Sequence, residues 1–265
     1  GGSLDVVADK NTPIPGGTGN FTSFLRFSVD GGNVVFLGDM GGSPNSMRGM
    51  YLYKCGTTEV VADGNTPVPG RSDNFSAFRL VSADGGNIAF VGFYPFGTGT
   101  FVHDGNTIHV VADNTTHVPG CNSMIFGSFP ALSADGANAA FLGTSHGDLC
   151  FINLDGTPNI GGPDPTQHGI YLAQGDSLSV IADEDTPIPG GDGDFSSFLG
   201  VSADGGKVAF QGAPDDTVTD AGIYLHDGNA IQIVADRNTP IPGGIGNFET
   251  FSGYSVDGDS VVFQG

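Results

Sequence analysis

Three short segments decide the fold: SADGGKVAF at 202–210, GIYL at 222–225 and IQIVAD at 231–236. The Asp204-Gly205 pair, which stands between two strand-like runs, is typical of a tight hairpin turn because such residues tolerate positive φ. A second pair of this kind, Asp227-Gly228, separates the last two segments. None of them shows a sustained 3.6-residue apolar period. The stretch therefore predicts antiparallel strands and almost no helix.

The same pattern recurs along all 265 residues at a spacing of roughly fifty residues, which is typical of repeat architectures. The units end in Val-Ala-Asp or a close variant, at Asp9, Asp63, Asp113, Asp183 and Asp236. Two phenylalanines follow each time, at 21 and 24, 75 and 78, 126 and 129, 195 and 198, and 248 and 251. Ser-x-Asp-Gly and further short strands complete the unit. The repeat predicts an all-β, five-bladed β-propeller of four-stranded antiparallel blades, with the phenylalanines in its core.

We place the blades at approximately 21–63, 75–113, 126–183, 195–236, and 248–265 joined by 1–9, in a single domain. The ring would be closed by pairing of the N-terminal strand with the C-terminal blade. The third strand of this fifth blade is missing from the sequence. The blade has three strands, or the strand lies in a longer chain, or a neighbouring molecule supplies it by strand addition. The last alternative would allow self-association through the incomplete fifth blade.

The segments at 202–210 and 222–225 resemble the blade signature of TolB-like propellers. The whole unit, including NTPIPGG at 11–17, is similar to tandem repeats of uncharacterised secreted bacterial proteins, notably cyanobacterial ones. The resemblance covers essentially the entire chain. It implies a propeller fold and an extracellular or cell-surface location, and it assigns no activity to any residue.

The composition is strongly acidic, with 8 Lys and Arg against 29 Asp and Glu and a formal net charge of -21. Phosphate recognition needs clustered basic residues, so nucleic acid and anionic membrane surfaces are poor partners. No apolar run approaches the roughly 18 residues of a membrane span. A cation, a carbohydrate or a basic protein surface is easier to accommodate, although the charge also serves solubility alone.

One face of the propeller would carry the long connections at 38–49, 92–99, 143–169 and 212–222, together with the segments between blades. Binding residues usually lie on variable loops of a constant scaffold. On this face Tyr94 and Phe96 could stack on a sugar ring or pack between loops. Asp215, Asp216 and Asp220 form an acidic loop that binds a ligand or is merely solvated.

The segments between blades carry closely spaced oxygen ligands that suit Ca²⁺. These residues are Asp9, Asn11 and Asn20; Asp63, Asn65 and Asn74; Asp183, Asp185 and Asp194; and Asp236, Asn238 and Asn247. The third copy has Thr115 at the middle position and Ile125 at the last, so both of these positions are lost together. The alternative is that Asp and Asn cap their own turns through backbone N–H groups.

The third blade concentrates histidine and cysteine. His117, His146 and His168 could bind a transition metal, since imidazole and thiolate are its usual ligands. The alternative is a Cys121–Cys150 disulfide surrounded by ordinary surface histidines. Cys55 lies at a hairpin on the opposite face, where we expect a lone thiol.

No Gly-x-Ser-x-Gly, phosphate loop or His-Glu-x-x-His motif occurs in the sequence. We therefore expect a non-enzymatic extracellular propeller that serves as a binding or structural module at a bacterial surface or matrix, with Ca²⁺ as its only candidate cofactor. Two alternatives are a fibre subunit assembled by strand exchange and a secreted glycoside hydrolase with carboxylates around the central channel.

Overall fold

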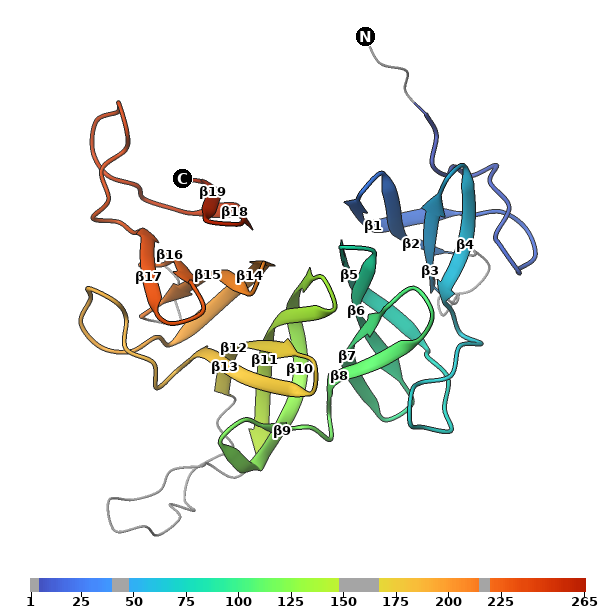
Figure 1. The fold of residues 1–265 in the computed structure, drawn as a ribbon, viewed down its shortest axis with the longest axis horizontal. Helices are drawn as coiled ribbons and strands as arrows, with labels where there is room; N and C mark the ends of the chain where they lie inside the picture. The colour runs from blue at the N-terminus through green and yellow to red at the C-terminus, as the bar shows by residue number, and fades with distance from the viewer. Residues whose placement is uncertain (1–4, 40–47, 148–166, 215–219) are drawn as a thin grey trace. The chain divides into compact units, whose positions relative to one another are not determined.

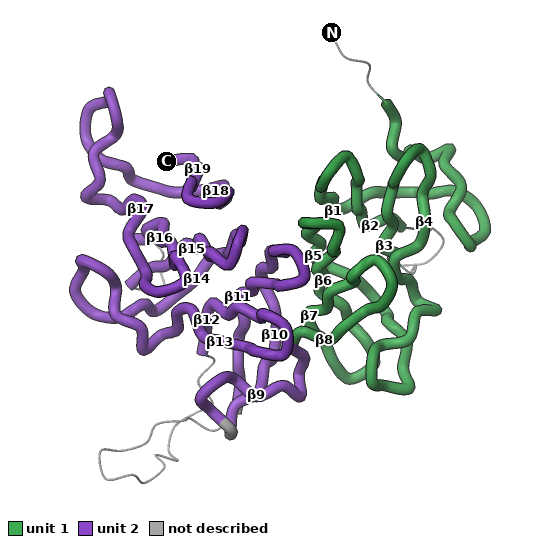
Figure 2. Tube along the Cα trace, viewed as in Figure 1, with its two compact units in different colours: residues 1–111 green, residues 112–265 purple. Residues whose placement is uncertain are grey.

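The chain forms β-strands and connecting turns throughout residues 5–39, 48–147, 167–214 and 220–265, which are the residues that the computed structural model describes (Figure 1). Contacts divide the chain into two compact units, Gly1–Val111 and Ala112–Gly265 (Figure 2). The described residues contain no helix, and so none that could span a membrane. The expectation of an all-β fold is confirmed.

The first unit contains two four-stranded sheets in which neighbours in sequence are neighbours in space. The first sheet consists of β1 (Ser23–Asp30), β2 (Asn33–Asp39), β3 (Arg48–Lys54) and β4 (Thr57–Ala62). The second consists of β5 (Ala77–Asp84), β6 (Asn87–Tyr94), β7 (Gly97–His103) and β8 (Ile108–Asp113). The pairs β1–β2, β2–β3, β3–β4, β5–β6 and β6–β7 are antiparallel.

The second unit contains three sheets. The third sheet is five-stranded: β9 (His117–Val118), β10 (Cys121–Asp135), β11 (Asn138–Gly147), β12 (Gln167–Gln174) and β13 (Ser177–Asp183). The fourth consists of β14 (Ser197–Asp204), β15 (Lys207–Ala213), β16 (Gly222–His226) and β17 (Ile231–Ala235). The last sheet has two strands, β18 (Ser252–Asp257) and β19 (Ser260–Gln264).

Three details differ from the sequence-based expectation. The third sheet gains β9, because β10 begins at Cys121 and pairs with the preceding segment through Cys121–Val118 and Ile125–His117. Residues 92–99 are not a long loop, since Tyr94 pairs with Gly97 across a two-residue turn. Residues 5–9 are described but form no strand, and β18 and β19 alone make the last sheet.

An aromatic cluster occupies the core of each sheet, as the phenylalanine pairs predict. In the second sheet the Phe75 ring meets Phe101 edge to face, with centroids 4.9 Å apart and planes at 87°. Phe78 and Phe90 complete this cluster at 5.3 and 5.7 Å from Phe75. Edge-to-face pairs of this kind stabilise beyond the area that they bury. The equivalent edge-to-face contacts are Phe21 with Tyr51, Phe126 with Tyr171, and Phe195 with Tyr224.

A glycine in the second strand makes room for the first phenylalanine. A Cβ atom added to Gly92 would lie 2.6 Å from the Phe75 ring, closer than real Cβ contacts come. Gly38, Gly143, Gly212 and Gly265 stand in the same relation to Phe21, Phe126, Phe195 and Phe248. The φ of Gly92 is not in the left-handed region, so it is the close approach of the ring that requires glycine there.

Consecutive sheets within each unit are joined by the Ser-x-Asp of the hairpin sequence. Ser28 Oγ accepts the N–H of Ala83 at 3.0 Å, and Asp30 accepts the N–H of Gly86 at 2.8 Å. The equivalent bonds run from Ala203 to Ser133, from Gly205 and Gly206 to Asp135, from Val256 to Ser202, and from Gly258 to Asp204. The serine and aspartate of one sheet thus bind the first strand and turn of the next.

Gly92→Ala is expected to lower the free energy of unfolding by about 1–3 kcal/mol, because the new methyl group overpacks the cluster around Phe75. Urea denaturation of the purified variant measures this change. In a Phe75→Leu background the smaller side chain leaves space, so the same substitution should destabilise less. Equal losses in both backgrounds would show that Gly92 serves another purpose.

Candidate functional site

The aspartate that begins each segment between sheets caps its own turn. In the fourth copy Asp183 Oδ1 accepts the Thr186 hydroxyl at 2.6 Å and the Asp185 N–H at 3.2 Å. Thr186 Oγ1 in turn accepts the Asp183 N–H at 2.9 Å. The same bonds form around Asp9, Asp63, Asp113 and Asp236. The turn-capping alternative thus describes what these side chains do.

The remaining members of the predicted calcium ligand sets are placed differently. Asn11, Asn65 and Asn238 donate from their side-chain amides to the second oxygen of the capping aspartate. Asn20, Asn74, Asp194 and Asn247 form isolated bridges to Pro13, Pro67, Pro187 and Pro240. The three carboxylates of the fourth copy do not gather their oxygens within 4.8 Å of one another. Calcium binding at these segments stays a prediction.

The third sheet places the three histidines by its register. Ile125 pairs with His117 on one side and with His146 on the other, so one strand separates the two imidazoles. His168 lies 3.5 Å from Glu184 through Nδ1. The three rings do not form a cluster with ligand atoms within 4.8 Å.

The predicted disulfide is only half within the described residues. Cys121 is disulfide-bonded, whereas Cys150, its predicted partner, lies outside them. Cys55 is a free, exposed thiol in the β3–β4 turn, as expected.

The two aromatic residues that were predicted to stack on a sugar ring differ in exposure. Tyr94 is buried, with the Arg71 guanidinium 4.6 Å from its ring centroid. Phe96, in the β6–β7 turn, is 97% exposed and has a φ of 71°. Tyr94 therefore serves packing, and Phe96 is the member of the pair that solvent reaches.

A cleft of about 330 Å³ at the loop end of the fourth sheet is lined by residues of two predicted groups, the acidic loop and the calcium ligand set. Asp220 lines this cleft together with Asp236, Arg237 and Asn238 of the segment between sheets. Arg237 donates to Asp220 Oδ1 at 2.7 Å. Both side chains of this pair are about half exposed. The cleft thus offers carboxylate, amide and guanidinium groups to a polar ligand. Asp215 and Asp216, the other members of the predicted acidic loop, lie outside the described residues.

Arg237 lines this cleft and is not among the residues that the sequence singles out. Its signal was present, because it is one of only 8 basic residues and stands inside the repeated segment next to Asp236. The spatial partner Asp220 is 17 residues away and belongs to a different connection, so spacing alone could not pair them.

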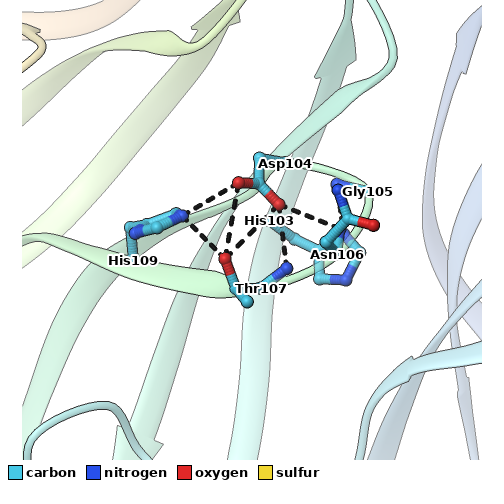
Figure 3. A network of polar contacts seen from close by, with 6 residues as sticks. All are labelled: His103, Asp104, Gly105, Asn106, Thr107 and His109. Carbon is cyan, nitrogen blue, oxygen red and sulfur yellow. Dashed lines mark hydrogen bonds and ion pairs between the residues drawn. The ribbon is translucent and has the colours of Figure 1, made fainter.

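A polar network lies in the β7–β8 turn, at the end of the second sheet away from the β6–β7 turn (Figure 3). The N–H groups of Asn106 and Thr107 donate to Asp104 Oδ1 at 2.9 and 2.8 Å. His109 Nε2 lies 3.0 Å from Asp104 Oδ2 and 2.9 Å from the Thr107 hydroxyl. The Thr107 N–H, then His109 and the Asn106 N–H hold the pKa of Asp104 well below its usual range.

His103 borders a cleft of about 210 Å³ between the first and second sheets. Its Nδ1 accepts the N–H of Gly105 at 3.1 Å, and burial lowers its pKa. Lys54 and Glu59 lie on the other wall. The fourth sheet repeats the turn at 226–229, where Gln232 takes the place of His109. The network therefore caps a turn, and the second and fourth sheets each contain a turn of this kind.

A family model described as "Family of unknown function (DUF7453)" matches residues 1–265. No curated protein matches the chain. Among solved structures, the β-propeller domain of the Trilobed protease from Pyrococcus furiosus is similar, with 11% identity, a TM-score of 0.40, and coverage of 92% of this chain and 79% of that one.

Uncomplexed acylaminoacyl peptidase from Pyrococcus horikoshii has 11% identity and a TM-score of 0.41, with coverage of 92% and 43% of the two chains. An acylaminoacyl peptidase in complex with Z-Gly-Gly-Phe-chloromethyl ketone has 11% identity and a TM-score of 0.43, with the same coverage. The chain spans less than half the length of these two peptidases.

Thr186→Val is expected to lower the free energy of unfolding by about 1–2 kcal/mol, because it removes the hydroxyl that both accepts from and donates to Asp183. The two side chains have nearly the same shape, so lost hydrogen bonds dominate the change. Chemical denaturation checks this. Thr186→Ser keeps the hydroxyl and should stay within about 0.5 kcal/mol of wild type; a loss as large as that of valine would contradict the capping role.

The Asp104 carboxyl should titrate below the value of about 3.9 that it has in unfolded chains. Because its folded-state pKa is depressed, the carboxylate contributes stability that is present above about pH 4 and is lost as the pH falls further. The stability difference between wild type and Asp104→Asn should therefore be largest near neutrality and shrink in acid.

Carbon-detected NMR of the Asp104 carboxyl gives its midpoint directly. Asp176→Asn, in the exposed β12–β13 turn, controls for the loss of one negative charge. A midpoint at or above about 3.9 would show that the network does not favour the ionised form.

Proposed function

This chain belongs to the DUF7453 family, and we propose that it is a non-enzymatic β-propeller that binds carbohydrate at a bacterial surface or matrix. The scaffold would be a five-bladed ring closed by its first and last blades. The cleft between Asp220, Arg237 and Asn238 is the observation that carries the proposal. Sugar hydroxyls are recognised by such mixed sets of carboxylate, amide and guanidinium groups, because each hydroxyl both donates and accepts.

The division of labour among polar residues supports a binding role. The repeated Asp and Thr residues cap turns, and the repeated Ser and Asp residues join sheets, so both sets are used by the scaffold. Arg237 and Asp220 belong to neither set. Non-repeated polar residues on a repeated scaffold are where specificity for a ligand is expected.

The direction of the strands supports the choice of the binding end of the sheets. The β2–β3, β11–β12 and β15–β16 connections leave their sheets at the end where the segments between sheets also lie, because the strands alternate in direction. The Asp-Gly hairpins lie at the other end.

Two features support an exported location. Cys121 is disulfide-bonded, and such bonds persist mainly in oxidising compartments. The net charge of -21 keeps a secreted protein soluble. The resemblance of the whole unit to tandem repeats of secreted bacterial proteins agrees with both. Calcium bound at the segments between blades would be an addition to this scaffold and is tested by calorimetric titration.

Glycan-array binding of the wild-type protein, followed by calorimetry with the strongest glycan, tests the proposal. Asp220→Ala should weaken binding by about tenfold or more, since hydrogen bonds to charged groups contribute about 1.5–3 kcal/mol. Asn229→Ala, in the exposed hairpin at the other end of the same sheet, is the matched control and should bind as wild type. Absence of glycan binding by the wild type, or equal binding by all three proteins, would refute the assignment.

A further inference from the structure

A second cleft adjoins the one that carries the proposed function. It has a volume of about 650 Å³ and is lined by residues of the fourth sheet and of the last sheet, both in the second unit. We call it the large cleft, and we call the cleft of about 330 Å³ the acidic cleft. Arg237 lines both, and Ala221 of the large cleft directly follows Asp220 of the acidic cleft. A ligand that contacts Arg237 can therefore extend from one cleft into the other.

Two hydrogen bonds fix the Arg237 side chain where the clefts adjoin. Its Nε donates to the Glu249 carbonyl of the large cleft at 3.2 Å, and its Nη1 donates to Asp220 Oδ1 of the acidic cleft at 2.7 Å. A guanidinium has more N–H donors than these two bonds use. Because the side chain is 45% exposed, a bound ligand can accept from the remaining donors.

The large cleft combines apolar side chains with hydroxyl groups. Leu199 of β14 lines it and is 47% exposed, and Phe251 and Tyr254 line it from the last sheet. Thr250 and Ser252 add exposed hydroxyls. A mainly apolar lining with a few placed polar groups is typical of ligand pockets. It also matches a sugar ring, which has an apolar face of C–H groups and hydroxyls around its edge.

The sequence departs from its repeat where the large cleft forms. Gln211 is only 8% exposed, although the equivalent residues of the first three sheets are apolar, namely Leu37, Val91 and Leu142. Its side-chain amide donates to the Phe251 carbonyl at 3.3 Å. A buried amide costs stability unless it is hydrogen-bonded. This bond joins the fourth sheet to the residue before β18 and so fixes one wall of the cleft.

Tyr254 is a second departure from the repeat. The residues that take its place in the register of the other four sheets are apolar: Phe27, Val81, Leu132 and Val201. The Tyr254 hydroxyl accepts the Gln211 N–H at 3.2 Å, and Gly200 leaves room for it, since a Cβ there would lie 2.9 Å from the hydroxyl oxygen. Burial raises the pKa of this hydroxyl. It therefore keeps its proton and serves the cleft as a hydrogen-bond donor.

Acidic groups outnumber basic ones around both clefts. Asp192, Asp220 and Asp236 line the acidic cleft, and Glu249 lines the large one. Among the described residues that line the two clefts, Arg237 is the only basic one. Like charges brought together oppose binding. A ligand that carries carboxylate or sulfate groups is therefore disfavoured.

We propose that the two clefts form one groove, which binds an oligosaccharide chain of at least two sugar residues without acidic groups. One sugar residue places its hydroxyls on Asp220 and Arg237 in the acidic cleft, and the next packs its apolar face on Leu199 in the large cleft. Each cleft lies within the range of about 300–1,000 Å³ that is usual for ligand pockets. The inference rests on the proposed carbohydrate function and specifies the length and charge of the chain.

The glycan array of the wild-type protein tests the length and the charge together when it carries each sugar as a mono-, di- and tetrasaccharide. Series of β-1,4-linked glucose, glucosamine and glucuronic acid should be among them. Within an uncharged or amino-bearing series, the di- and tetrasaccharide should bind about tenfold or more tightly than the monosaccharide, because they add contacts in the large cleft. The glucuronic acid series should bind at least about tenfold more weakly than the glucose series.

The outcomes separate this inference from the function on which it rests. Equal binding of mono- and tetrasaccharides, or a preference for glucuronic acid chains, overturns the inference and leaves a carbohydrate-binding protein. Absence of binding to every glycan overturns both. This comparison uses the wild-type protein, so it does not depend on the folding of any variant.

Leu199→Ala tests the large cleft directly. It should weaken tetrasaccharide binding by about tenfold in calorimetry, because the apolar contact is lost, and it should narrow the difference in affinity between the tetrasaccharide and the monosaccharide. Leu25→Ala is the matched control, since Leu25 has the equivalent position in β1 and is 46% exposed. It should bind as wild type. Unchanged tetrasaccharide binding by Leu199→Ala, or an equal loss in both variants, would contradict the groove.

Discussion

The close approach of one phenylalanine ring to one glycine in each sheet is the constraint on which the other contacts depend. The Phe75 ring takes the space that a Cβ on Gly92 would fill, and it meets Phe101 of the third strand edge to face. Because Phe75 lies two residues before β5, this contact fixes where the segment between sheets ends. Its N–H also donates to the carbonyl of Thr66, which ties the capped turn to the core.

Polar residues of the repeat then serve two structural tasks. Asp183 and its equivalents hold their turns, and Ser133 with Asp135 joins one sheet to the next. A carboxylate that already accepts several N–H and O–H groups has fewer lone pairs left for a cation. Residues outside these two repeated sets include the ion pair of Arg237 and Asp220.

The contacts between consecutive sheets also explain why equivalent apolar residues differ in exposure. Apolar residues are buried wherever one sheet follows another within a unit, as Val35 and Phe78 show. The same positions are exposed on β1 and β19, where Phe27 and Val262 reach 75% and 72%.

The sequence by itself determined the all-β fold, the hairpin turns and the aromatic core, because these depend on local periodicity and on residue pairs a few positions apart. Only the tertiary structure decided which polar residues act together. Ser28 meets Ala83 across 55 residues, and Arg237 meets Asp220 from another connection. Likewise Tyr94 and Phe96 look equivalent in the sequence, yet Tyr94 is buried and Phe96 is exposed. The reason is that Tyr94 is the last residue of β6, whereas Phe96 lies in the two-residue turn to β7. Such partners are set by packing between strands, which spacing along the chain does not encode.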